Sequence, residues 1–350
     1  MENIIYIVDK KNSALHIAAT TRVYFSGGKI LIANEYRSTL QLLKKINEEK
    51  DGIILFCWRK ALADIISLKR SINLYKEIER KFTLVFLIPD HMGLEKNFGS
   101  TEAKMINACD YYVVTSQILF NEYCAKYPSK PPKMIFHDLP NVQLISEVRN
   151  KFPKKNYNKI RIIWVGNSMW GQRQGYNDHK GYVSVISQLK SDIAKHGDCC
   201  DLVVIDSATN YLPQYQVLKC IRDSDILLQT SRNEGTGLPI IEALGLGTEV
   251  ISNRVGVASE ILYESQILDN FDIEKLHENI HASSNLGNQE NLIEQYDSYI
   301  SNSVKESLVF SDSIKSLPTD YFIKHKIIIK LYWIYRYMLN LKSNTLRKVT

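Results

Sequence analysis

Two glutamates, Glu234 and Glu242, flank a glycine-rich turn and could take part in binding or catalysis. Gly235 and Gly237 have no β-carbon, so the backbone there can approach a ligand closely, and Pro239 suits the first turn of a helix. The free amides at the start of that helix and the positive end of its dipole favour a diphosphate. Carboxylates accept hydrogen bonds from paired hydroxyls, which ribose and hexose both offer. The turn therefore has the chemistry to hold a nucleotide sugar.

This segment resembles the E-x7-E signature of the family-4 glycosyltransferases. The positions that match the family pattern are Ser231, Glu234, Gly235, Gly237, Leu238, Pro239, Glu242, Ala243, Gly247 and Val250. Glu249 stands where the family usually has a proline. Two glutamates beside such a turn, taken alone, favour another interpretation, in which one caps a helix and the other is solvated. The shared register, after a predicted strand and at the start of a predicted helix, favours the family.

The resemblance implies a retaining, metal-independent glycosyltransferase with the GT-B fold. By resemblance, Glu234 contacts the donor sugar in a catalytic role and Glu242 contacts the ribose. The donor phosphate would be held by the amides of Gly235, Thr236, Gly237 and Leu238. No metal or other cofactor is expected. The expected partners are a nucleotide-diphosphate sugar and a glycan or lipid-linked acceptor, in assembly of a cell-surface polysaccharide such as a lipopolysaccharide or a capsule.

Further donor contacts are expected earlier in the chain. By the same resemblance Lys180 binds the donor diphosphate, where a fixed cation would stabilise the charge that develops on the leaving phosphate. Asn167 stands where the family usually has an arginine. Arg173, in the long loop 168–179, either folds back to supply that cation at the donor site or is an ordinary solvated arginine.

The glycine-rich turn around Gly235 and Gly237 is called the donor loop below. Two positions outside it carry weaker signals of function. His91 follows the predicted strand Thr83–Ile88, and the resemblance makes it a catalytic candidate near the reacting carbon. The alternative is an ordinary loop histidine. Glu260, close to a second glycine loop, is expected to cap the helix that follows it.

Short β-branched runs alternate with helical stretches along the chain, which indicates parallel strands buried on both faces. The predicted strands are Ile4–Val8, Lys29–Ala33, Gly52–Cys57, Thr83–Ile88, Tyr111–Thr115, Lys133–Phe136, Arg161–Val165, Leu202–Ile205, Ile226–Gln229 and Glu249–Ser252. The pattern occurs twice, so the sequence predicts an α/β fold of two Rossmann-like, doubly wound domains that face a cleft. Ligands of such sheets bind beyond the carboxyl ends of the strands, where the candidate residues lie.

A polar stretch at residues 150–159 suggests a domain boundary. We predict an acceptor domain at 1–152, a nucleotide-sugar donor domain at 153–310 and a C-terminal helical segment at 311–350. The resemblance covers residues 161–262 closely, 83–142 loosely and 1–80 not at all. In the last segment, residues 324–342 combine apolar and basic side chains. This helix either packs on the first domain or rests on an anionic membrane surface.

The composition and charge of the chain limit the classes of function that it can have. The 350 residues include 44 Lys and Arg against 38 Asp and Glu, a net charge of +6, and the charges are mixed along most of the chain. Nucleic-acid binding is not expected, since no dense basic stripe with interleaved aromatics occurs. The six cysteines show no paired metal-ligand spacing. Without a signal peptide or a long apolar run, the expected location is cytoplasmic, either free or peripheral at the inner face of the membrane.

Two alternative functions are also compatible with the sequence. A nucleotide-sugar epimerase shares the two-domain architecture, although the E-x7-E register favours transfer. An inactive nucleotide-binding partner of a glycan synthase would also be consistent with the sequence, because Asn167 and the loop from Gly256 to Glu260 depart from the family pattern. The sugar, the base, the acceptor and the oligomeric state are not decided by the sequence.

Overall fold

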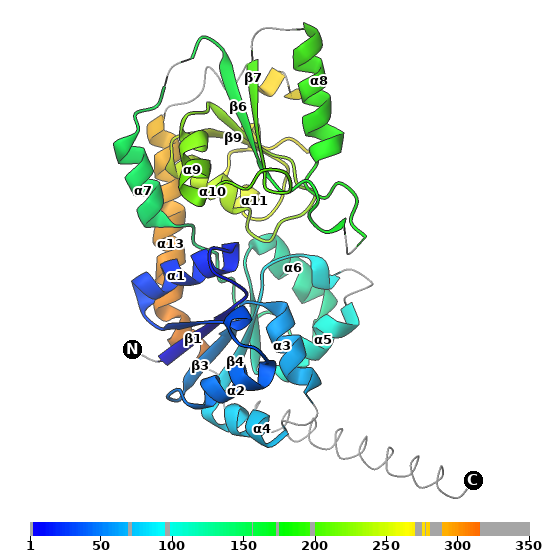
Figure 1. Cartoon of the computed structure of the whole chain (residues 1–350), viewed down its shortest axis with the longest axis vertical. Coiled ribbons are helices and arrows are strands. Elements are labelled where there is room, and N and C mark those ends of the chain that lie inside the picture. The colour runs from blue at the N-terminus through cyan, green and yellow to red at the C-terminus, as the bar shows by residue number, and fades with distance from the viewer. Residues whose placement is uncertain are drawn as a thin grey trace, which may run out of the picture. The chain divides into compact units, whose positions relative to one another are not determined.

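The computed structural model describes residues 3–68, 72–94, 99–155, 157–172, 175–196, 200–269, 275–276, 278–280 and 289–315. The chain forms two compact units, Met1–Leu308 and Val309–Thr350. Both sheets belong to the first unit (Figure 1). The described part of the second unit is the end of the helix α13 (Gln289–Lys315). The predicted helix at 324–342 lies outside the described residues.

The first sheet is parallel throughout, with the strand order β2-β1-β3-β4-β5. Its strands are β1 (Asn3–Val8), β2 (Lys29–Ile32), β3 (Gly52–Phe56), β4 (Phe82–Ile88) and β5 (Tyr111–Val114). Each is apolar over most of its length because both of its faces are covered. The helices that alternate with these strands are α1 (Ala14–Ser26), α2 (Thr39–Asn47), α3 (Arg59–Ser67), α4 (Ile72–Lys81), α5 (Gly99–Ala108) and α6 (Gln117–Lys126).

Serine caps set the start of several of these helices. The hydroxyls of Ser13, Ser38 and Ser116 each accept the backbone amide of the residue three positions further along the chain. One core cluster joins strand residues such as Ile54 and Phe86 to the helices. The carboxyl ends of the strands are thereby held at one edge, where His91 follows β4.

The second sheet is also parallel, in the order β7-β6-β8-β9. Its strands are β6 (Ile160–Gly166), β7 (Cys200–Asp206), β8 (Ile226–Gln229) and β9 (Glu249–Ser252). The helices around it are α7 (Val142–Lys151), α8 (Ser187–His196), α9 (Gln214–Arg222), α10 (Leu238–Gly245), α11 (Ala258–Ile261) and part of α13. A π-helical turn, Tyr182–Ile186, leads into α8. Alternate strand residues, such as Ile163 and Trp164, enter two separate core clusters, which confirms burial on both faces.

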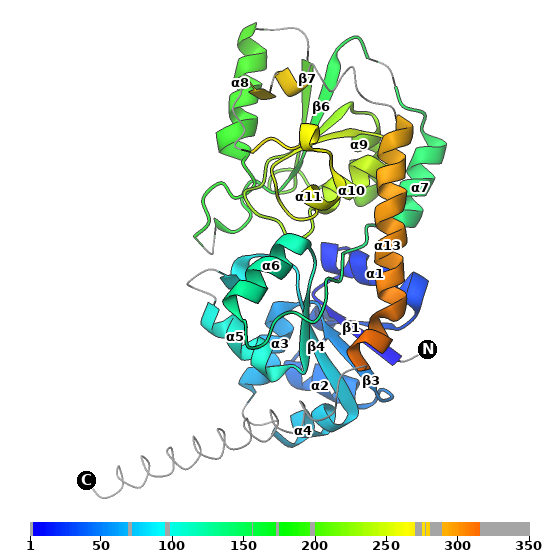
Figure 2. The same ribbon diagram turned by 180° about the vertical axis from the view of Figure 1, so that it is seen from behind.

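Helices α7 and α13 lie side by side along the second sheet (Figures 1 and 2). Ile145 and Val148 of α7 join the same core cluster as Tyr296 of α13. Residues 142–151 therefore share a core with the second sheet, although the predicted boundary at 152 groups them with the first. The three-part division of the chain stays a prediction.

Nine of the ten predicted strands are confirmed, and Lys133–Phe136 is wrong. Only an isolated bridge joins Ile135 to Val114 there. The strand does not form because Arg22 binds the carbonyl oxygens of Phe136 and His137, at 3.0 and 2.7 Å. These oxygens are therefore not available for pairing with a neighbouring strand. This segment carries the chain from the first sheet toward α7. No helix within the described ranges is both long and apolar enough to cross a membrane.

Candidate functional site

The glycine-rich turn joins the end of β8 to the start of α10, as the sequence predicts. Gly237 adopts the left-handed conformation, with φ of 80°, at the N-cap of α10. A β-carbon on Gly235 would lie 1.7 Å from the carbonyl oxygen of Pro89, which follows β4. Only glycine permits this approach, so the turn lies directly against the loop that carries His91. In the first turn of α10, Pro239 has no N–H and the amide of Ile240 donates to the carbonyl oxygen of Gly237 at 2.9 Å, which leaves the amide of Leu238 as a donor for a ligand.

Glu234 lies in this turn and forms an ion pair with Lys180. Both side chains are 17% exposed. Gln229, the last residue of β8, also donates its amide to the Glu234 carboxylate at 3.0 Å. Burial alone would raise the pKa of Glu234, but the Lys180 ammonium and a hydrogen bond from Ser231 outweigh it and lower the pKa. Glu234 is therefore held as a carboxylate at the edge of the sheet.

Lys180 is fixed through its backbone as well as its side chain. Its carbonyl accepts a hydrogen bond of 2.6 Å from the Thr230 hydroxyl, which in turn accepts one of 3.0 Å from the indole of Trp164. These hydrogen bonds link Trp164 of β6, Thr230 after β8 and Lys180. Lys180 directly precedes Gly181, the N-cap of the π-helical turn. Lys180 is thus held in contact with Glu234, which lies 54 positions further along the chain.

Glu242 lies inside α10 and is 7% exposed. Burial raises its pKa to about 7, and a hydrogen bond from Gln214 of α9 opposes that shift only in part. A carboxyl with this pKa exchanges its proton near neutral pH. It retains acceptor positions beyond the one that Gln214 occupies, so it can receive the two hydroxyls of a ribose.

Asp206, at the end of β7, is a further candidate residue, for which no site role was predicted from the sequence. Its carboxylate accepts the Ser168 hydroxyl at 2.6 Å and the amides of Ser168 and Ala208, each at 3.0 Å. Burial raises its pKa, but these hydrogen bonds lower it overall. Asp206 ties the loop after β6 to the loop after β7. A carboxylate directly after the predicted strand Leu202–Ile205 was the available signal.

His179 was also missed. Its Nε2 lies 2.9 Å from the carbonyl oxygen of Asn233, and its ring lies 4.4 Å from that of Trp170. Burial lowers its pKa, and the neighbouring Lys180 lowers it further. A neutral His179 therefore holds the donor loop one residue before Glu234. Its position beside Lys180 was the only signal in the sequence.

His91 is 9% exposed in the loop after β4. Its Nε2 lies 3.0 Å from Glu122, and its buried Nδ1 has no hydrogen-bond partner among the residues that the structure describes. Asp90 steadies the loop by accepting the Met92 amide at 2.9 Å and pairing with Arg59 at 3.1 Å. His91 is close enough to lower the pKa of His179. The structure thus brings His91 to the edge that carries Glu234.

Three other expectations have different outcomes. Asn167 accepts the Met169 amide at 3.0 Å and so organises a local turn. Arg173 lies outside the described residues. The expectation that Glu260 caps the helix that follows it is wrong. The Glu260 carboxylate accepts the amide of Gln117 at 2.9 Å and so caps α6, which lies 143 positions earlier in the chain.

Asp223 and Asp225, with Ser224 between them, have the spacing of an Asp-x-Asp metal site. Asp223 pairs with Lys155 at 2.9 Å, and Asp225 accepts the Arg161 amide at 2.8 Å. Both lie before β8, at the opposite end of the strand from Glu234. Throughout the described ranges, no three His, Cys, Asp or Glu side chains are grouped to hold a metal ion.

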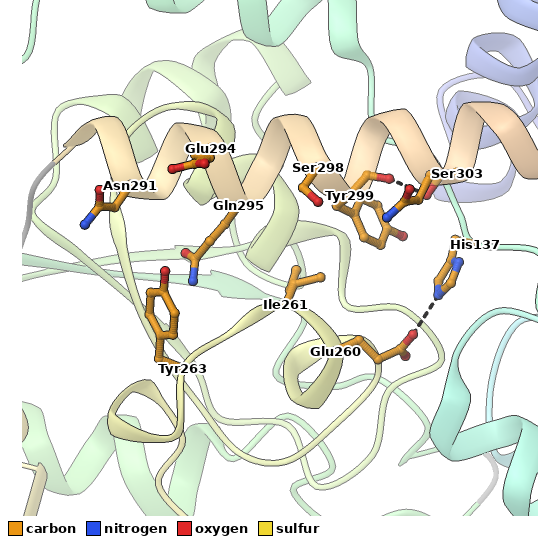
Figure 3. Close-up of a pocket in the computed structure, with 11 residues that line it drawn as sticks. His137, Glu260, Ile261, Tyr263, Asn291, Glu294, Gln295, Ser298, Tyr299 and Ser303 are labelled. Carbon is orange, nitrogen blue, oxygen red and sulfur yellow. Dashed lines mark hydrogen bonds and ion pairs between the residues drawn. The ribbon is translucent and has the colours of Figure 1, made fainter.

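A cavity of about 410 Å³ lies between the α11 region and α13. Figure 3 shows His137 and Glu260 joined at one end of it, 2.8 Å apart. Burial alone lowers the pKa of His137, but hydrogen bonds to Glu260 and Glu306 raise it to about 9. Most of the α13 side chains that line the cavity are exposed, and none of the predicted donor contacts borders it. We therefore place the candidate site at the edge around Glu234 and Glu242.

Comparison with known proteins agrees with this fold. Residues 207–301 match the family model described as "Glycosyl transferases group 1". No curated protein matches the chain in sequence. Among solved structures, the chain is similar to HepE from Anabaena in complex with UDP and glucose, with 11% identity, coverage of 91% of this chain and 100% of that one, and a TM-score of 0.60.

Two further structures are similar. A UDP-forming α,α-trehalose-phosphate synthase from Burkholderia xenovorans has 9% identity, coverage of 90% and 99%, and a TM-score of 0.62. TarM from S. aureus, in complex with fondaparinux, α-GlcNAc-glycerol and UDP, has 12% identity and a TM-score of 0.52. That match covers 83% of this chain and 57% of the TarM chain. The predicted GT-B class of α/β fold is thereby confirmed.

Proposed function

We propose that the chain is a glycosyltransferase that moves a sugar from a uridine-diphosphate sugar to an acceptor hydroxyl. The single observation that carries the proposal is the arrangement of Glu234 and Glu242 around the turn that opens α10. One carboxylate is held at the edge by Lys180, and the other is buried beside Gln214. Their chemistry fits the two ends of a nucleotide sugar. The presence of UDP in the HepE and TarM structures supports uracil as the base.

The diphosphate would lie at the start of α10, where free amides and the helix dipole favour an anion. Lys180 would stabilise the charge that develops on the leaving phosphate. Glu242 would accept the ribose hydroxyls, and Glu234 would contact the transferred sugar. His91, whose Nδ1 is buried beside this edge, would hydrogen-bond a sugar hydroxyl or the acceptor.

The finer parts of the proposal rest on the sequence resemblance. We propose transfer with retention, without a metal ion, to a glycan or lipid-linked acceptor in cell-surface polysaccharide assembly at the cytoplasmic face of the membrane. The basic and apolar residues at 324–342 support contact with anionic lipid. A cation from Arg173 would complete the diphosphate site in place of Asn167.

A thermal-shift series tests donor binding. UDP and UDP-glucose should raise the melting temperature more than ADP or GDP, because a ligand that binds the folded state stabilises it. The increase should persist with EDTA, and it should be reduced in Glu242→Gln. If none of these nucleotides changes the melting temperature, donor binding is ruled out.

Product analysis tests the reaction itself. With a bound donor sugar established, NMR of the transferred sugar should show the same anomeric configuration as in the donor. An epimerised nucleotide sugar formed without any acceptor would instead identify an epimerase. Unchanged glycan synthesis in cells that carry both Glu234→Ala and Glu242→Ala would identify an inactive partner.

A further inference from the structure

Asp138 lies in the segment that carries the chain from the first sheet to α7, and it is 7% exposed. Its two carboxylate oxygens have different partners. Oδ1 lies 3.0 Å from the guanidinium of Arg22, and Oδ2 accepts a hydrogen bond of 3.1 Å from the hydroxyl of Thr236. The Asp138 carbonyl also accepts the Tyr299 hydroxyl at 2.8 Å. Asp138 therefore connects three elements that are far apart in sequence.

Arg22 fixes this carboxylate from the side of the first sheet. It belongs to α1, is fully buried, and also binds the carbonyl oxygens of Phe136 and His137. Its guanidinium lies 4.1 Å from the centre of the Phe136 ring. A buried cation needs a paired anion, and Asp138 is that anion. Oδ1 is thus committed to Arg22, and Oδ2 remains for the donor loop.

Thr236 is the residue of the donor loop that Asp138 binds. It stands between Gly235 and Gly237 and is 4% exposed. Its carbonyl accepts the Val257 amide at 3.0 Å. Because the glycines on either side place few limits on their own torsion angles, the contacts of Thr236 determine where the loop amides point. A hydrogen bond to a carboxylate is stronger than one between neutral groups, so it is suited to this task.

We infer that Asp138 is a positioning residue for the donor diphosphate, which acts through the Thr236 hydroxyl, with Arg22 holding Asp138 in place. The inference rests on the proposed function, because it assigns the loop amides to a diphosphate. It extends the site to α1 and to the segment between the sheets. Small displacements of groups that contact a substrate are costly, which is why a residue without contact to the donor controls its binding.

The test measures UDP affinity by titration calorimetry on the full chain. Thr236→Val keeps the side-chain shape, removes the hydroxyl and leaves the Arg22–Asp138 pair intact. It should weaken UDP binding by about 10-fold to 100-fold, the range for losing a hydrogen bond to a charged group. Thr236→Ser restores the hydroxyl and should bind UDP within about 3-fold of the wild type, because the bond to Asp138 re-forms.

Two further variants separate positioning from general stability. Thr248→Val removes a buried hydroxyl that binds the carbonyl oxygens of Ile221 and Ser224, so it should lower the melting temperature and leave UDP affinity unchanged. Asp138→Asn replaces the hydrogen bond between carboxylate and hydroxyl with a weaker neutral one, so it should weaken UDP binding, and adding Thr236→Val to it should weaken binding little more, since both changes act on the same contact.

The outcomes are distinguishable from those of the proposed function. If the wild-type protein does not bind UDP, the proposed function fails. If the wild type binds UDP and Thr236→Val binds it equally well, the positioning role of Asp138 is wrong while donor binding stands. Should Asp138→Asn fail to fold because Arg22 loses its partner, the two Thr236 variants still decide the question.

Discussion

The buried carboxylate of Glu242 accepts a hydrogen bond of 3.1 Å from the amide of Gln214. Burial raises its pKa from 4.5 to about 7, and within the described part of the chain no cation opposes this shift. This separates it from Glu234, whose pKa is lowered by Lys180 despite its burial. The two glutamates of one signature therefore have opposite electrostatic environments.

The raised pKa of Glu242 predicts a stability that falls with pH. Between pH 4.5 and about 7 the folded protein binds more protons at this group than the unfolded chain does, so the contribution of Glu242 is present below 4.5 and lost as pH rises through 7. Glu242→Gln removes this slope. At pH 8 it should raise the free energy of unfolding by on the order of 3 kcal/mol, measured by urea titration, while weakening UDP binding.

Glu249→Gln is the matched control for that prediction. Glu249 is 8% exposed, and burial also raises its pKa, but it lies at the start of β9 and is bound by Gln266. The substitution should change the pH dependence of stability in the same direction and leave UDP affinity unchanged. Equal losses of UDP affinity in both variants would contradict the role proposed for Glu242.

Loss of the Lys180 ammonium should lower the rate of sugar transfer strongly, with a smaller effect on the stability of the fold. Lys180→Met is expected to lower kcat/KM by about 100-fold, because a fixed cation no longer stabilises the leaving diphosphate. Lys190→Met, an exposed lysine on α8, serves as the control and should keep full activity. Steady-state release of UDP measures both. A Lys180→Met enzyme with normal kcat/KM would remove Lys180 from the proposed mechanism.

His137 predicts a second pH dependence, in the alkaline range. Its pKa is raised from 6.5 to about 9 by Glu260 and Glu306, which outweigh its burial. Its contribution to stability is therefore present below pH 6.5 and lost as pH rises through 9. Over that range the stability difference between the wild type and His137→Gln should shrink by on the order of 3 kcal/mol. Urea titrations at pH 6, 7.5 and 9.5 measure it, with His16→Gln as the control. A difference that is constant with pH would contradict the prediction.

Gly235→Ala tests the close approach of the two loops. The new β-carbon would lie 1.7 Å from the backbone oxygen of Pro89, which no side-chain movement can relieve. The loops must separate, so UDP binding should be lost and stability should fall by about 1–3 kcal/mol. Gly99→Ala has no contact closer than 3.3 Å and should be nearly neutral in the same calorimetric and melting experiments. Wild-type UDP affinity in Gly235→Ala would show that this approach is not needed for binding.

Much of the fold could be predicted from the sequence because buried parallel strands have a local signature. Apolar runs such as Ile226–Gln229 and Glu249–Ser252 coincide with β8 and β9 at both ends. The run Lys133–Phe136 is also largely apolar but is not a strand, because Arg22 binds the carbonyl oxygens of Phe136 and His137, which would continue the ladder. Composition alone does not reveal such a competing partner.

The sequence by itself determined the two-sheet α/β class and the strand, turn and helix around Glu234 and Glu242, because these depend on residues close together in the chain. Only the tertiary structure decided which side chains meet. Asp138 reaches Thr236 across 98 positions, and Glu260 caps a helix 143 positions away. Such pairs leave no local pattern, since each partner alone is an ordinary polar residue. Their contact follows from the packing of elements that are distant in sequence.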